Sequence, residues 1–194
     1  MPYELDPAIL SPEGVPFQVQ RVVVLDAPES DPVTSEDAAA HLRISAGGDL
    51  LALFISAATD YAERATGLSF VPRTLRATFY DGEPIALPRG PIVEVQNVCD
   101  RDGDAVTDWE LQHGRGCGAE VIFTGAAPAY PVSVTYSAGH SPTSTIPPSV
   151  KVAILQHVAT MWENRESVSD KGMSAVPHTL DDFYRLLGQD RRVS

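Results

Sequence analysis

Positively charged residues are scarce in this chain. Its 194 residues include 14 lysines and arginines against 26 aspartates and glutamates, which gives a formal net charge of −12 at pH 7. Proteins that hold nucleic acid through its phosphates need a cationic surface, and this balance leaves little material for one. Lys151 and Lys171 are the only lysines. The composition therefore argues against tight non-specific DNA binding and against polybasic attachment to a membrane.

Cysteines and long apolar runs are also scarce. Cys99 and Cys117 are the only cysteines, so a disulfide scaffold is excluded and a reducing cytoplasm is the expected compartment. The longest apolar run, 50–58, contains Ser56 and is too short to cross a bilayer. The first ten residues lack the basic and apolar regions of a signal peptide. We therefore expect neither a membrane span nor export by a signal peptide.

A hydrophobic content of 43% supports a packed core, and the length suits one domain with extensions or two small domains. Prolines and glycines cluster before residue 33, around a strand-like run at 19–25. This pattern predicts an extended N-terminal arm at 1–33. We expect a core domain at 34–166, followed by a linker and a C-terminal segment at 167–194.

Two helices are predicted after the arm. Thr34 is placed to cap a short helix ahead of two acidic residues, which the helix dipole favours in the first turn. This helix should end near Ile44. A second helix, begun by Asp49, carries apolar residues at helical spacing, and Gly67 is its expected end.

From residue 70 the apolar period changes to two, which indicates β-strands. Four strand-like runs bounded by turn residues occur at 75–80, 93–98, 120–124 and 132–136. The connections between them are too short for helical crossovers, which excludes a doubly wound parallel sheet. We expect an antiparallel meander.

A long helix is predicted from Pro147 to about Arg165, and Thr179 can cap a short last helix at 180–187. The predicted fold class is therefore α+β: two N-terminal helices, an antiparallel β-sheet region, a long helix and a short C-terminal helix.

The long helix is apolar over an arc about twice as wide as the ~100° stripe of a one-sided surface helix. A second apolar stripe, beside the first, consists of Leu155, Ala159 and Trp162. A helix of this kind needs two partners. One could be the chain's own sheet and the other a neighbouring subunit; alternatively, the two N-terminal helices could sandwich it inside the monomer.

The sequence has none of the common catalytic or nucleotide-binding motifs: no GxxxxGK[ST], no GxGxxG after a strand, no HExxH and no GxSxG. The best remaining candidate for chemistry is His113 with Cys117 and Cys99, which could ligate zinc or act as base and nucleophile. Further ligands would have to come from scattered residues, and the glycines around Cys117 are typical of a hairpin turn. We expect no metal and no cofactor. A small cytoplasmic enzyme that uses His113 and Cys117 is kept as the alternative.

Other candidate groups have structural explanations. His140 is followed by a serine but lacks a third, orienting group, which favours a loop histidine. His157 lies at the edge of the long helix's apolar arc, where a core or interface histidine is expected. The aspartates at 100–108 do not form a calcium loop because Gly103 is misplaced and no glutamate follows at the twelfth position. We interpret them as a solvated hairpin tip.

Five stretches of the chain have a more specific pattern. In order, they are PVTxEDAxxHLRI at 32–44, IxxAxxYxExxTG at 55–67, LPRGPIxxV at 87–95, VTYSAG at 134–139, and IPPxVKxAIL leading to WENRE at 146–166. The series resembles the head–tail connector proteins of long-tailed phages and gene transfer agents, also called adaptor or head-completion proteins. The resemblance spans roughly residues 22–187, whereas the arm is longer than in the family pattern.

The resemblance implies a structural protein without catalysis or cofactor. It implies a subunit that forms a ring, expected to be twelve-fold, between the portal and the stopper or tail. This places it in the neck of a virion or phage-like particle, assembled in the host cytoplasm, where DNA passes through the ring without specific binding. Within the same class, the alternatives are another ring component, either a stopper or a tail terminator.

Net acidity suits such a channel, because negative subunits repel phosphate and let the DNA slide. Ring closure requires different faces of one subunit to meet. We expect Leu155, Ala159 and Trp162 to form part of that subunit interface.

Family members that resemble this chain attach to the portal through their C-terminal end. The matching segment here combines aromatic, aliphatic and cationic side chains, which suit docking on a partner. The expected portal-docking residues are Phe183, Tyr184, Arg185, Leu186, Leu187, Arg191 and Arg192. The alternative is a short helix that folds back onto its own domain and ends in a frayed tail.

Overall fold

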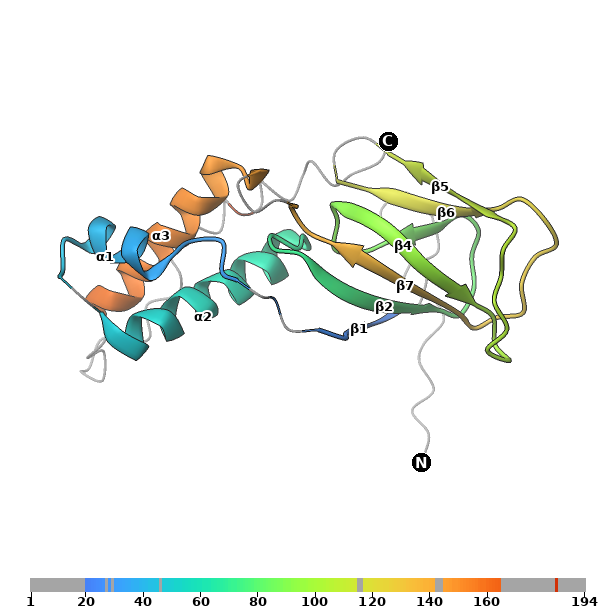
Figure 1. Cartoon of the computed structure of the whole chain (residues 1–194), viewed down its shortest axis with the longest axis horizontal. Helices are drawn as coiled ribbons and strands as arrows, with labels where there is room; N and C mark the ends of the chain where they lie inside the picture. The colour runs from blue at the N-terminus through green and yellow to red at the C-terminus, as the bar shows by residue number, and fades with distance from the viewer. Residues whose placement is uncertain are drawn as a thin grey trace, which may run out of the picture.

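The computed structural model describes residues 20–26, 28, 30–45, 47–114, 117–141, 145–164 and Tyr184. Within these residues, three helices lie at one end of the molecule and seven strands at the other (Figure 1). The first two helices follow β1 in the chain and the third follows β7, so the helical end is built from segments far apart in sequence. The predicted α+β class is confirmed.

The helices are α1 (Ser35–Leu42), α2 (Gly48–Thr66) and α3 (Pro148–Glu163). Thr34 caps α1 as predicted: its hydroxyl accepts from the Asp37 N–H at 3.1 Å, and the Asp37 carboxylate accepts from the Thr34 N–H at 3.2 Å. Gly67 ends α2 in the left-handed conformation, with φ of 66°. Arg43 takes the same conformation after α1, which ends that helix slightly before the predicted Ile44.

The strands form two antiparallel sheets. The four-stranded sheet has the order β1 (Gln20–Val24), β2 (Arg73–Phe79), β7 (Val132–Ala138) and β4 (Ile92–Cys99). The three-stranded sheet has the order β3 (Ile85–Leu87), β6 (Ala119–Phe123) and β5 (Trp109–His113). The exclusion of a parallel sheet is confirmed, whereas a simple meander is wrong, because β7 inserts between β2 and β4.

The two sheets share one apolar core. It contains Leu75 and Phe79 of β2, Ile85 of β3, Val121 of β6 and Tyr136 of β7, all fully buried. Alternating burial along β2, β6 and β7 turns one face of each strand to this core. The apolar face of the four-stranded sheet is therefore covered by the other sheet.

A second, separate core lies among the helices. It joins Leu51 and Ile55 of α2 to Ile154 of α3 and to Phe70, which follows α2. The expectation that α3 packs on the chain's own sheet is wrong: α3 packs on α2 and α1. The reason is that the sheet face is already occupied, whereas the apolar stripes of α2 and α3 need each other. The sandwich between the N-terminal helices is the alternative that the structure adopts.

The described end of the predicted arm is part of the folded domain. Val22 of β1 lies opposite Ala77 of β2, and Val33 is 2% exposed in the helical core. Residues 1–19 lie outside the described part of the chain.

Candidate functional site

The predicted subunit interface on α3 is half covered by its own chain. Leu155 and Trp162 are partly buried and pack against the helical core, and the Trp162 ring meets Phe54 edge-on at a centroid distance of 6.2 Å. Ala159 is also half-buried. The three residues lie on one side of α3, and their outward parts stay accessible to a partner.

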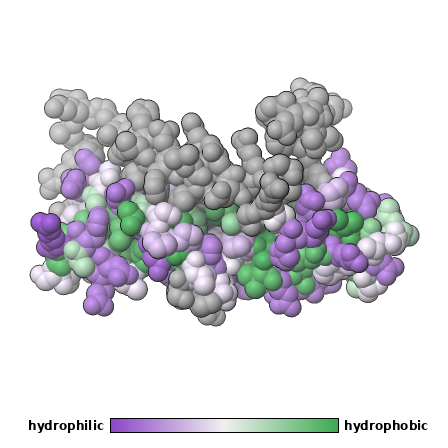
Figure 2. Space-filling model, turned by 90° about the horizontal axis from the view of Figure 1, so that it is seen from above, coloured by the Kyte–Doolittle hydropathy of each residue, from purple (hydrophilic) through white to green (hydrophobic). Residues whose placement is uncertain are grey.

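Sequence analysis missed the most exposed apolar residues of the helical end. Val152 is 47% exposed, and Leu50 and Leu53 of α2 are 42% and 63% exposed. Val152 precedes Leu155 by three positions and so extends the α3 stripe by one turn. Figure 2 shows apolar patches among polar residues on one side of the molecule, over both the helical and the β end. Extending the stripe backwards at helical spacing would have found Val152.

Among the predicted docking residues, only Tyr184 lies in the described part of the chain. Phe183, Arg185, Leu186, Leu187, Arg191 and Arg192 lie outside it. Tyr184 is fully buried in the helical core. Its hydroxyl lies 3.4 Å from the Ala153 carbonyl oxygen and 3.4 Å from His157 Nδ1. The Tyr184 side chain is therefore held against α3 and does not itself form an exposed surface.

His157 completes this aromatic cluster. Its side chain is buried at 5% exposure, and the ring meets Tyr61 of α2 edge-on, with centroids 5.0 Å apart. The Tyr61 and Tyr184 rings lie 5.8 Å apart. The predicted core position of His157 is confirmed.

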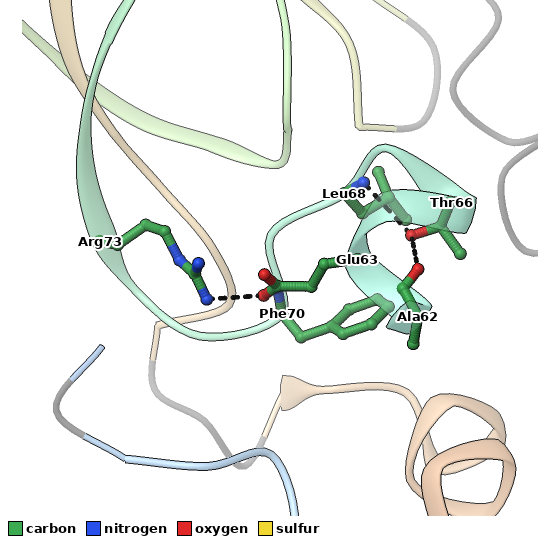
Figure 3. A network of polar contacts seen from close by, with 6 residues as sticks. All are labelled: Ala62, Glu63, Thr66, Leu68, Phe70 and Arg73. Atoms are coloured by element: carbon green, nitrogen blue, oxygen red, sulfur yellow. Dashed lines mark hydrogen bonds and ion pairs between the residues drawn. The ribbon is translucent and has the colours of Figure 1, made fainter. Parts of the chain in front are cut away.

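A polar network joins the helical end to the sheets (Figure 3). Glu63, near the end of α2, accepts hydrogen bonds from the Phe70 N–H at 3.0 Å and from Arg73 Nη2 at 2.7 Å. The Glu63 and Arg73 side chains are only 3% and 9% exposed. Burial raises the pKa of the Glu63 carboxyl above its usual range, and the Phe70 N–H and the Arg73 charge oppose this rise. The buried carboxylate holds both ends of the connection from α2 to β2.

The loop at 88–91 ties further elements to the same junction. The Tyr136 hydroxyl of β7 donates to the Pro88 carbonyl at 2.8 Å, and the Ser69 N–H donates to the Gly90 carbonyl at 2.9 Å. A Cβ on Gly90 would lie 1.8 Å from the Cys117 carbonyl oxygen, so only glycine fits there. Close packing where the two ends of the molecule meet therefore explains the residues of the LPRGPI stretch.

The candidate chemical groups His113 and Cys117 lie on either side of the turn between β5 and β6. His113 is exposed at the end of β5, and Cys117 is half-buried in the turn that leads to β6. The Gly114 N–H donates to the Gly118 carbonyl at 3.0 Å, which confirms the predicted hairpin turn. In the described part of the chain, no three His, Cys, Asp or Glu side chains are grouped so that they could hold a metal. Burial lowers the pKa of His140, which is half-buried in the segment after β7.

The acidic tip between β4 and β5 forms a tight turn. Asp100 Oδ1 accepts hydrogen bonds from the Asp102 and Asp104 N–H groups, each at 3.0 Å. This carboxylate therefore stabilises the turn of its own loop. Beside the tip is an open polar hollow of about 390 Å³, lined by Arg76, Arg101 and residues of β4 and β7. The prediction of a solvated hairpin tip is confirmed.

No helix within the described ranges is both long and apolar enough to cross a membrane.

Comparisons with known proteins show the fold. No protein-family model matches the chain, and none of the curated proteins matches its sequence. Among solved structures, the chain is similar to one from a structure described as "Virion of native gene transfer agent (GTA) particle", with a TM-score of 0.67, 20% identity, and coverage of 89% of this chain and 96% of that one. A chain from "Neck of native GTA particle computed with C12 symmetry" gives a TM-score of 0.67 at 18% identity, and one from "Neck of empty GTA particle computed with C6 symmetry" gives 0.64 at 19%. Each of these two matches covers 90% of this chain and 96% of the other. The chain therefore has the fold of these particle chains over nearly its whole length.

Proposed function

We propose that this protein is a structural component of the neck of a phage-like particle, and specifically the adaptor that forms a ring between the portal and the stopper or tail. The observation that carries the proposal is the fold shared with neck chains over 90% of this chain and 96% of theirs. A match of this extent includes both the helical end and the sheets, so it concerns the whole subunit and not one common motif.

The ring is expected to be twelve-fold, as the resemblance implies. The neck with a similar chain was computed with C12 symmetry, which supports this number. Closing a ring requires a heterologous contact between two different faces of the subunit. The outward side of α3, with Val152, Leu155, Ala159 and Trp162, supplies one apolar face for this contact.

DNA passes through the proposed ring without being held. The net charge of −12 disfavours contact with phosphate, because binding through phosphates requires clustered cations. Acidic subunits around a channel repel the duplex over about one Debye length, roughly 8 Å at physiological salt. The wall of such a channel therefore needs no catalytic group and no cofactor.

The C-terminal segment is the proposed portal-docking element. Tyr184 anchors this segment to α3, and the two arginines at 191 and 192 lie shortly after it. In this proposal, the buried ring is a fixed point on the domain, and the residues that follow it in the sequence contact the portal. Cationic side chains there suit acidic residues on the partner.

Electron microscopy of the purified chain mixed with its portal tests the proposal. We expect an added collar on the portal ring. The chain should also be retained by immobilised portal and not by the tail-tube protein. Retention by the tail tube alone would instead identify a stopper or tail terminator, and the absence of any collar would overturn the adaptor role.

A truncation tests the docking element separately. Removing residues 185–194 leaves Tyr184 in place, so the fold should persist while portal binding is lost. Replacing Arg191 and Arg192 by glutamate should weaken binding in the same assay, whereas the matched Arg101→Glu change at the exposed hairpin tip should not. Full portal affinity of the truncated chain would contradict this assignment.

A further inference from the structure

Among the described residues, strand β1 has no partner strand on one of its two sides, so it forms an edge of the four-stranded sheet. It pairs only with β2 among the described strands and lies at the margin of the sheet (Figure 1). The Leu25 N–H donates to the Thr74 carbonyl at 2.9 Å. In an antiparallel pair, the backbone groups of alternate residues hydrogen-bond to the partner strand. The backbone groups of Val23 and Arg21 therefore also hydrogen-bond to β2. The backbone N–H and C=O groups of Val22 and Val24 therefore point to the open edge.

The opposite edge of the same sheet is protected. Strand β4 has two register shifts against β7, and its end is covered by the following residues, since the Val106 N–H donates to the Val98 carbonyl at 2.9 Å. Strand β1 has no register shift and no proline. Bulges and covering loops are the usual ways in which proteins block an edge against other strands. Strand β1 has neither device among the described residues, which leaves its edge able to pair with another strand.

The side chains along this edge define what the partner strand must carry. Val22 and Val24 lie on the core side of the sheet, opposite Ala77 and Leu75, and Val24 is 42% exposed. On the other side, Arg21 lies beside Arg76, which is opposite Val23. A complementary strand would alternate apolar residues, for the side of the valines, with acidic residues, for the side of the arginines.

The chain contains a segment with this alternation. Tyr3-Glu4-Leu5-Asp6 has apolar and acidic residues at alternate positions, and it lies outside the described residues. The following residues 7–19 can span about 45 Å when extended, so residues 3–6 can lie far from the β1 strand of their own chain.

We infer that residues 3–6 of a second copy of this chain add as an antiparallel strand to the β1 edge, with Tyr3 opposite Val24 and Leu5 opposite Val22 on the core side. On the other side, Asp6 then lies opposite Arg21, and Glu4 lies opposite Val23. The inference rests on the proposed ring. Passing each arm to the next subunit produces a heterologous contact that repeats until the ring closes. It also gives the N-terminal arm a role.

Cysteine cross-linking tests the contact in the full chain. In a Cys99→Ser, Cys117→Ser background, Tyr3→Cys is combined with Val24→Cys, because directly opposite residues of antiparallel strands lie about 5.5 Å apart, which a disulfide can bridge. After mild oxidation we expect a ladder of covalent multimers on a non-reducing gel. The matched control combines Tyr3→Cys with Val93→Cys, at a valine 49% exposed on the protected β4 edge, and should stay monomeric.

The outcomes separate the strand exchange from the adaptor role. The oxidation is run on the concentrated chain alone and on the chain with its portal, and collars are counted by microscopy in parallel. A ladder supports strand exchange whether or not a collar forms, and a collar without a ladder overturns the exchange alone. A disulfide only within one chain, seen as a monomer of changed mobility, also overturns it.

Charge exchange provides a second test. Arg21→Glu should lower the multimer fraction several-fold in low salt, and adding Glu4→Arg and Asp6→Arg to the same chain should restore it. Equal multimer fractions in all three proteins would contradict the pairing of these side chains.

Discussion

Arg73 and Glu63 form a buried ion pair between the two cores of the molecule, with Nη2 of Arg73 2.7 Å from Oε1 of Glu63. Glu63 belongs to α2 of the helical core, and Arg73 is the first residue of β2 in the sheet core. Because the same carboxylate accepts the Phe70 N–H, one side chain fixes the connection between helices and sheets. In the proposed ring this matters, since the subunit contacts close only if they keep a constant relative orientation.

Removing the cation of this pair should destabilise the fold. Arg73→Met leaves the buried Glu63 carboxylate without its counter-charge, and the expected loss in free energy of unfolding is about 3 kcal/mol. Adding Glu63→Gln removes the uncompensated charge and should recover part of the loss. Urea unfolding of the wild type, both single variants and the double variant measures this. If the double variant lost the sum of the two single losses, the two residues would not be coupled.

The pH dependence of stability should have opposite signs at two carboxyl groups. Burial raises the pKa of Glu63 from its usual 4.5, so the folded state favours the protonated carboxyl. The resulting contribution to the free energy of unfolding is present below about pH 4.5 and is lost as the pH rises through the raised pKa. Hydrogen bonds within the cap lower the pKa of Asp37 from 3.8, so its contribution is present above pH 3.8 and is lost as the pH falls.

Two variants separate these effects. The stability of the wild type relative to Glu63→Gln should fall between pH 4.5 and neutrality, whereas its stability relative to Asp37→Asn should fall on acidification below pH 3.8. Thermal unfolding over this pH range gives both differences. The same direction of change for both variants would show that at least one pKa shift has another sign.

The elements that could be predicted from sequence are those that local chemistry determines. The N-cap Thr34 and the helix end at Gly67 depend on residues within one turn of the helix, and both were found where the sequence placed them. Strand β3 was missed because three residues are too few to show a period, and β5 because WELQH has only two apolar residues.

The relationships that could not be predicted depend on distant segments. The partner of α3 was misassigned because the sequence does not show that a second sheet already covers the first. The ion pair of Glu63 and Arg73 was missed because its residues belong to different element types, with no periodic relationship. The burial of Tyr184 beside His157 likewise joins residues 27 positions apart.

The buried Tyr184 should contribute strongly to the stability of the helical end. Truncation to alanine removes a fully buried ring, and we expect a loss of about 3 kcal/mol in free energy of unfolding. Tyr184→Phe keeps the ring and removes only the hydroxyl, for an expected loss of about 1 kcal/mol. Denaturant unfolding of both variants measures the difference. Wild-type stability of Tyr184→Ala would mean that the ring does not hold the C-terminal segment on α3.

The exposed stripe of α3 should contribute to assembly and not to folding. Val152 is 47% exposed and Val93 on β4 is 49% exposed, so replacing either by aspartate adds the same charge at equal exposure. Neither change buries the new carboxylate, and each should alter the free energy of unfolding by less than about 0.5 kcal/mol. If the α3 stripe meets a neighbouring subunit, Val152→Asp forces a charge into an apolar contact and should abolish ring formation, whereas Val93→Asp should not. Native mass spectrometry of the three proteins with the portal measures the number of bound subunits, and equal occupancy for both variants would remove the α3 stripe from the interface.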